Sequence, residues 1–125
     1  MDKNFYLSEA DKWFSLAEEY INTDICDDGL VLHYLKDASL NYLKALGLEY
    51  NLHVENISSL KDIIFELQKK TTIKFPDFIN QILDIDDISV SDGCATSICF
   101  DIDFYGDIYD AVKELRNFVN KQISL

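Results

Sequence analysis

The side chains of this chain that could do chemistry are mostly carboxylates. From Phe75 to Val112 no Lys or Arg interrupts a run of nine Asp residues. Residues 101–107 within it resemble a calcium loop, with alternating aspartates and Gly106 at the sixth position. However, Tyr105 and Val112 occupy the fifth and twelfth positions, where such a loop needs oxygen ligands. Asp101 and Asp103 form an Asp-x-Asp pair like that of nucleotidyltransferases, but the Gly-Ser that normally precedes such a pair is missing. We therefore favour a solvated acidic surface over a metal site.

The imidazoles and thiols form no catalytic or metal-binding pattern. His33 and His53 have no matched set of ligands nearby in the sequence, and Cys94 and Cys99 lack the second pair that a zinc site needs. With Cys26 they make an odd number of cysteines, which favours idle thiols in a reducing compartment. We predict no catalytic residues, no metal ligands and no cofactor, and hence a protein that is not an enzyme.

The charge balance limits the classes of partner. The chain has 23 acidic and 11 basic residues, for a formal net charge of −12. Phosphate backbones and anionic membranes attract clustered Lys and Arg, so we expect direct contact with neither. No apolar run is long enough to span a membrane, and the N-terminus has no apolar signal core. The sequence predicts a cytoplasmic protein.

The spacing of apolar residues predicts one all-α domain over residues 1–125. With 48% hydrophobic residues, four Gly and one Pro, the composition suits long helices around one core. Helices are expected at about 8–23, 28–48, 57–67, 75–83 and 108–122, in an up-down bundle of four to five helices. The second is apolar on more than one side and should be central. The expected helix-end signals are Ser8, Gly47, Ser58 or Asn56, and Pro76.

The segment near residues 85–106 has two interpretations. Ile98, Phe100, Ile102 and Phe104 alternate with polar residues or cysteine, which is a strand pattern and could form a hairpin with residues 88–90. An isolated hairpin would need a helical surface to cover it. We therefore favour an irregular loop or short helix with some β-like character.

Four parts of the chain resemble the HEPN domain family. Residues 38–47, ASLNYLKALG, are similar to the family's "AAEKALKALL" pattern, and residues 13–17, WFSLA, to its first helix. Residues 58–64, SSLKDII, look like the start of its third helix, and the last helix like its final segment. The resemblance implies a helical bundle that usually dimerises. Members either cut RNA or pair with a nucleotidyltransferase.

The catalytic motif that the resemblance would carry is missing. The family's ribonucleases have an Arg followed, four to six residues later, by a His, in a cleft at the dimer interface. Here the only arginine, Arg116, lies downstream of both His33 and His53, and Ser59 stands where the family has a His. Phosphoryl chemistry of this kind needs a cation and an imidazole together. The resemblance therefore implies the fold without the nuclease activity.

Two functions fit these observations. The first is a non-catalytic, HEPN-like helical interaction module, homodimeric and part of a nucleotidyltransferase or toxin–antitoxin pair. The second is a small acidic immunity or inhibitor protein that binds a basic toxin or nucleic-acid enzyme. Both predict a basic protein partner. The residues expected to bind it are Asp101, Asp103, Phe104, Tyr105 and Asp107.

Overall fold

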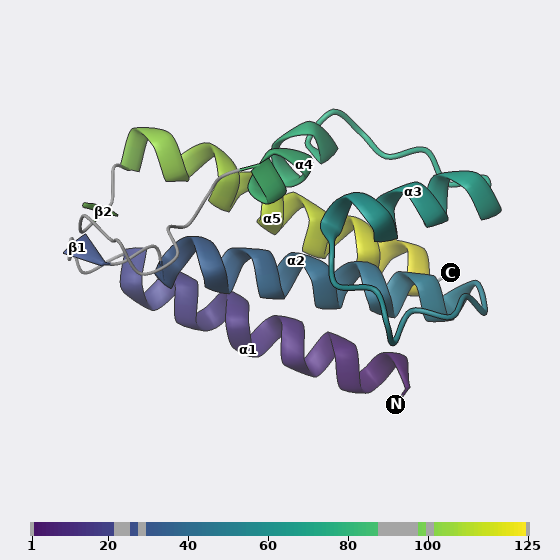
Figure 1. Ribbon diagram of the computed structural model, residues 1–125. Coiled ribbons are helices and arrows are strands. Elements are labelled where there is room, and N and C mark those ends of the chain that lie inside the picture. Colours follow the sequence, from purple (N-terminus) through teal and green to yellow (C-terminus); the bar gives the residue numbers. More distant parts are fainter. Residues whose placement is uncertain (1, 22–25, 28–29, 88–97, 100–101, 125) are drawn as a thin grey trace.

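Over the residues that it describes, the computed structural model of the protein is an all-α bundle of five helices with one two-residue β pairing (Figure 1). The structure describes residues 2–21, 26–27, 30–87, 98–99 and 102–124. The all-α prediction is confirmed. The elements, in chain order, are α1 (Lys3–Ile21), β1 (Cys26–Asp27), α2 (Leu30–Glu49), α3 (Leu60–Lys70), α4 (Ile79–Asp87), β2 (Ile98–Cys99) and α5 (Ile102–Ser124).

Helix α2 forms the centre of the bundle and contacts each of the other four helices (Figure 1). Helix α1 lies antiparallel along one side of it, and α3, α4 and α5 cover the rest. This explains the apolar residues on more than one side of α2, and the prediction that it is central is confirmed. Its buried apolar side chains are Val31, Leu32, Leu35, Ala38, Tyr42, Leu43, Ala45 and Leu46.

Helix α1 begins earlier than the sequence predicted. Ser8 was expected to cap it, but Ser8 lies inside the helix, which starts at Lys3. The cap is provided by Asp2, whose Oδ1 accepts a hydrogen bond of 2.9 Å from the backbone N–H of Phe5. The added turn buries Tyr6 on the same stripe as Phe14. Both Asp and Ser are good capping residues, so the burial of this turn decides between them.

Gly47 does not end α2, contrary to the prediction. It lies within the helix, and the connection to α3 packs directly on it. A Cβ at Gly47 would lie 2.7 Å from Cγ1 of Val54. The chain turns two residues after the end of α2, where Asn51 adopts a left-handed φ of 62°. The N–H of Leu52 then donates to the carbonyl of Gly47 at 2.9 Å.

The remaining helices are shifted relative to their predicted ends. Ser59 caps α3, rather than Ser58 or Asn56, and Lys69 and Lys70 lie in its last turn. Pro76 precedes α4 and is not part of it. Its carbonyl accepts from the N–H of Ile79, the first residue of that helix. Helix α5 begins at Ile102, six residues before the predicted start.

The described part of the segment near residues 85–106 is helical at both of its ends. Helix α4 extends to Asp87, and α5 already begins at Ile102. The strand character is confirmed at Ile98 and Cys99, but their partner is β1, far away in the sequence. The pairing is antiparallel, with Cys26 opposite Cys99 and Asp27 opposite Ile98. The proposed hairpin partner, residues 88–90, and Phe100 lie outside the described residues.

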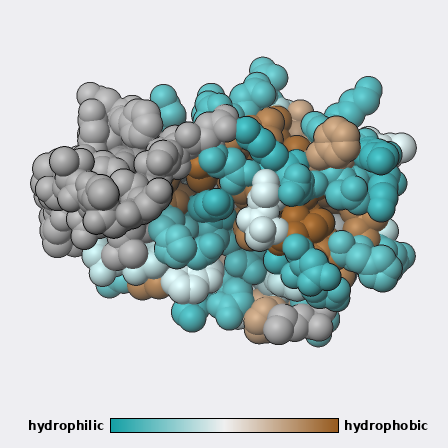
Figure 2. All heavy atoms as spheres, in the orientation of Figure 1, coloured by the Kyte–Doolittle hydropathy of each residue, from teal (hydrophilic) through white to brown (hydrophobic). Residues whose placement is uncertain are grey.

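Hydrophilic side chains cover most of the coloured surface in Figure 2, with hydrophobic ones showing between them. The large apolar residues that the described surface exposes are Phe5, Tyr50 and Phe65, which lie on separate elements. No helix in the described part of the chain is long and apolar enough to cross a membrane.

Candidate functional site

The predicted partner-binding residues lie at the start of α5. Asp103, Phe104 and Tyr105 are in its first turns, and Asp107 is exposed just after them. Asp101 lies outside the described residues. Because α5 is already helical at Ile102, most of residues 101–112 cannot adopt the geometry of a calcium loop.

Helical periodicity arranges the carboxylates of α5 along one face. Asp107, Asp110 and Glu114 are spaced three and four residues apart, so they share a face of the helix. The structure shows all three to be exposed. We call these three residues the α5 acidic stripe. Their arrangement concentrates negative charge without metal-ligand geometry.

Beside the stripe, α5 contacts α1 through aromatic and charged side chains. The rings of Phe14 and Tyr109 stack with centroids 5.3 Å apart and planes at 7°. The hydroxyl of Tyr109 donates a hydrogen bond to Glu18. The guanidinium carbon of Arg116 lies 4.9 Å from the Phe14 ring centroid. These contacts hold α5 against α1, so the chain's only arginine is part of a packed contact between helices.

A second tyrosine–carboxylate pair joins α1 to α2. Tyr42 of α2 is fully buried, and its hydroxyl donates to Asp11 of α1. Burial raises the pKa of Tyr42, and the hydrogen bond to Asp11 raises it further. Burial and the bond to Glu18 raise the pKa of Tyr109 to about 12. Arg116 opposes both shifts, which places it near both phenols.

We call these six residues the α1–α5 edge: Asp11, Phe14, Glu18, Tyr42, Tyr109 and Arg116. Its phenols stay protonated at neutral pH and act as donors to carboxylates, so neither can serve as a general base. The only sequence signal for this edge is spacing. Asp11, Phe14 and Glu18 are three and four residues apart, and Tyr109 and Arg116 are seven apart, which places each set on one helical face.

The two histidines are not part of this edge. Nε2 of His33 lies 3.1 Å from Oδ2 of Asp37, one turn later on the exposed side of α2. Arg116 acts on Tyr42, which is nine residues after His33 and so about 13 Å further along the helix axis. His53 is exposed in the connection between α2 and α3. The described residues therefore do not bring the arginine and an imidazole together.

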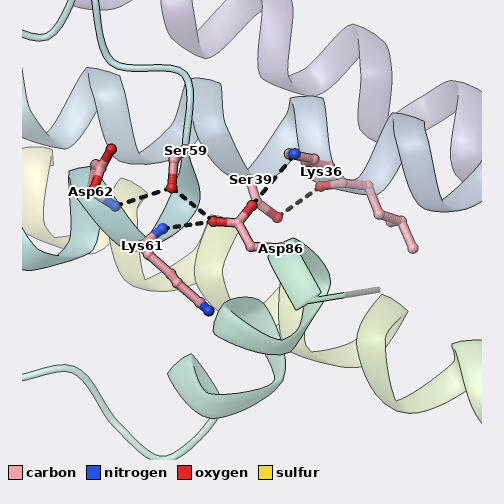
Figure 3. A network of polar contacts seen from close by, with 7 residues as sticks. Lys36, Ser39, Ser59, Lys61, Asp62 and Asp86 are labelled. Carbon is pink, nitrogen blue, oxygen red and sulfur yellow. Dashed lines mark hydrogen bonds and ion pairs between the residues drawn. The ribbon is translucent and has the colours of Figure 1, made fainter. Parts of the chain in front are cut away.

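A buried carboxylate joins three helices on another side of the bundle (Figure 3). Oδ2 of Asp86, in α4, accepts a hydrogen bond of 3.0 Å from the Ser59 hydroxyl and one of 2.9 Å from the backbone N–H of Lys61. Ser59 also accepts from the N–H of Asp62 at 3.3 Å. On the α2 side, Nζ of Lys36 is 3.5 Å from Oδ1 of Asp86.

This cluster of Lys36, Ser59, Lys61 and Asp86 stabilises the N-terminus of α3. A carboxylate beside free N–H groups at a helix start is favourable, because they and the helix dipole attract negative charge. The side chain of Asp86 is only 9% exposed. The prediction that the acidic run is solvated is therefore wrong at Asp86. Ser59 has a carboxylate partner but no imidazole to activate it, so the cluster has a structural role.

Within the described residues, no group of three or more His, Cys, Asp or Glu side chains is placed to hold a metal ion. The chain matches no protein-family model, no curated protein and no solved structure. Its function is therefore inferred from its own residues and their geometry.

Proposed function

We propose that this chain is a non-catalytic, HEPN-like helical module that works by binding a protein partner. The observation that carries the proposal is the position of Arg116, whose guanidinium packs over the Phe14 ring at the α1–α5 edge. A ribonuclease of the resembled kind needs this cation beside an imidazole, where it stabilises the charge on the reacting phosphate.

The surroundings of the histidines support the same conclusion. His33 is paired with Asp37 and lies about 13 Å along α2 from the region near Arg116. The carboxylates of the α1–α5 edge accept hydrogen bonds from Tyr42 and Tyr109. Carboxylates would also repel the phosphates of RNA approaching this edge. A binding role fits these side chains better than catalysis.

A ribonuclease assay tests this proposal. The purified protein is incubated with structured and single-stranded RNA, and we expect no cleavage above a buffer control. Cleavage that persists through a second purification and is lost in a folded Arg116→Ala or His33→Ala variant would refute a non-catalytic role. Cleavage that a second purification removes would come from a contaminant and leave the expected result in place.

The α5 acidic stripe is our candidate for the partner surface. Its members Asp107, Asp110 and Glu114 are exposed, and the whole chain carries a formal net charge of −12. Such a surface attracts a basic protein and speeds its association, and added salt screens the attraction. The stripe also favours the second candidate function, an acidic immunity or inhibitor protein bound to a basic toxin or nucleic-acid enzyme.

Binding kinetics test the stripe once a protein that co-purifies with the tagged chain has been isolated. The variant Asp107→Asn/Asp110→Asn is compared with the control Glu55→Gln/Asp62→Asn, which removes two exposed charges from other elements. We expect the association rate at low salt to fall about three- to tenfold in the stripe variant and much less in the control. Equal effects of the two variants would contradict a role for the stripe.

The identity of the partner separates the two candidate functions. A nucleotidyltransferase encoded beside this chain supports the module, and a toxin or a nucleic-acid enzyme that it inhibits supports the immunity protein. Measuring the partner's activity with and without this chain decides between them. Full inhibition at equimolar ratio indicates an inhibitor.

A further inference from the structure

Two cysteines that are distant in the sequence lie opposite each other in the fold. Cys26 is in β1, between α1 and α2, and Cys99 is in β2, just before α5. The antiparallel pairing makes them direct partners across the two strands. Figure 1 shows both strands together at the end of the bundle away from the two chain termini.

The backbone geometry of such partners suits a disulfide. Residues directly opposite in an antiparallel pair have Cα atoms about 4.5–5.5 Å apart. A disulfide bridges Cα atoms that are about 4.4–6.8 Å apart. We propose that Cys26 and Cys99 form a reversible disulfide, and that this is a redox modification site of the protein. The inference is independent of the proposed binding function.

The reaction needs a disulfide oxidant such as oxidised glutathione. The thiolate of one cysteine attacks a sulfur of the oxidant, which forms a mixed disulfide and releases one glutathione thiolate. The thiolate of the second cysteine then attacks the protein sulfur of the mixed disulfide, and the second glutathione leaves. The two cysteines lose two protons and two electrons in all, and one oxidised glutathione becomes two reduced molecules.

The disulfide would join two connections whose described residues pair as the short strands β1 and β2. One precedes α2, the central helix, and the other precedes α5 and its acidic stripe. A covalent link there restricts the unfolded chain and fixes the start of α5 relative to α2. Oxidation should therefore raise the unfolding temperature, and reduction should return it to its starting value.

The competing thiol makes the test discriminating. Cys94 lies outside the described residues and is only five positions from Cys99, so proximity along the sequence alone favours a bond between those two. The full chain is oxidised with glutathione mixtures, both as the native protein and during refolding from denaturant. During refolding, thiols that would be buried in the native protein are as accessible to the oxidant as exposed ones. Peptide mapping under non-reducing conditions then identifies the bond.

We expect oxidation to lower the mass of the chain by about 2 Da, since each disulfide removes two hydrogens. The disulfide should form within one chain, and dithiothreitol should reverse it. The linked peptides should contain Cys26 and Cys99, and Cys94→Ser should form the same bond as the natural chain. Cys26→Ser and Cys99→Ser should each lose it. Three outcomes would overturn the proposal: a predominant bond to Cys94, bonds only between chains, or no Cys26–Cys99 bond under either condition.

Discussion

Replacing Gly47 by Ala tests whether the connection after α2 packs as tightly as the structure shows. The new Cβ would lie 2.7 Å from Cγ1 of Val54, well inside van der Waals contact, and 3.7 Å from Cδ1 of Ile63. Both neighbours are fully buried, and Val54 is β-branched and therefore stiff, so relief needs a shift of the backbone. Overpacking of this kind costs about 1–3 kcal/mol.

Helix propensity acts in the opposite direction. Ala in place of Gly inside a helix contributes about 0.5–1 kcal/mol in favour of folding. We expect Gly47→Ala to lower the free energy of unfolding by a net of about 1–2 kcal/mol. Gly106 provides the matched control, because it is also inside a helix and its Cβ would meet nothing within 4 Å. Gly106→Ala should therefore raise stability by about 0.5–1 kcal/mol.

Urea denaturation followed by circular dichroism measures both variants. A second change locates the strain: Val54→Ala removes the methyl group nearest the new Cβ, so the double variant should lose less stability than the two single losses combined. If Gly47→Ala proves as stable as Gly106→Ala, the close packing of Val54 on α2 is refuted.

Three further predictions concern the buried carboxylate, the tyrosines and the assembly. Asp86→Ala should lower the free energy of unfolding by about 2–3 kcal/mol, because the N-terminus of α3 and Lys36 lose their partner. As a control, Asp84→Ala, at an exposed position, should change it by less than about 0.5 kcal/mol. Equal losses of the two variants in urea titrations would contradict the structural role of the cluster. Tyr109 has a raised pKa in the folded state, so its contribution is complete below pH 10 and lost as the pH rises towards about 12. Tyr109→Phe should therefore lose less stability than the natural chain between pH 10 and 12, and identical pH profiles would refute this. Light scattering at tens of micromolar should report a homodimer, and a monomer alone would contradict that prediction.

The helical stripes could be predicted from the sequence because they depend on local periodicity. Val31, Leu35, Ala38 and Tyr42 recur at helical spacing, and all four are buried in α2. The helix ends could not be predicted as well. Several residues near each end can cap a helix, and contacts with distant parts of the chain decide among them. Gly47 was expected at the end of α2, but it lies inside the helix, where its lack of a side chain lets Val54 pack closely against it.

The candidate sites depended even more on long-range contacts. Sequence spacing placed Asp103 and Asp107 before the last helix, whereas the structure has both within α5. It gave no sign that Asp86 is buried at the start of α3, or that Arg116 packs on Phe14. The sequence predicted no role for the cysteines, because Cys26 and Cys99 become neighbours only when α1, α2 and α5 have assembled.

The placement of the carboxylates determines which of them a partner can contact. Asp86 is used inside the fold, and the exposed members of the stripe continue along α5 to Glu114. From Asp107 to Glu114 the stripe is about 10 Å long, since a helix rises 1.5 Å per residue. Charges are screened over about 8 Å at physiological salt, so a cation that faces one end of the stripe interacts only weakly with the carboxylate at the other end. A partner that binds along the whole stripe must therefore carry a row of Lys or Arg residues of similar length. Replacing one carboxylate should then change the association rate only slightly, and the effect should grow with each further replacement.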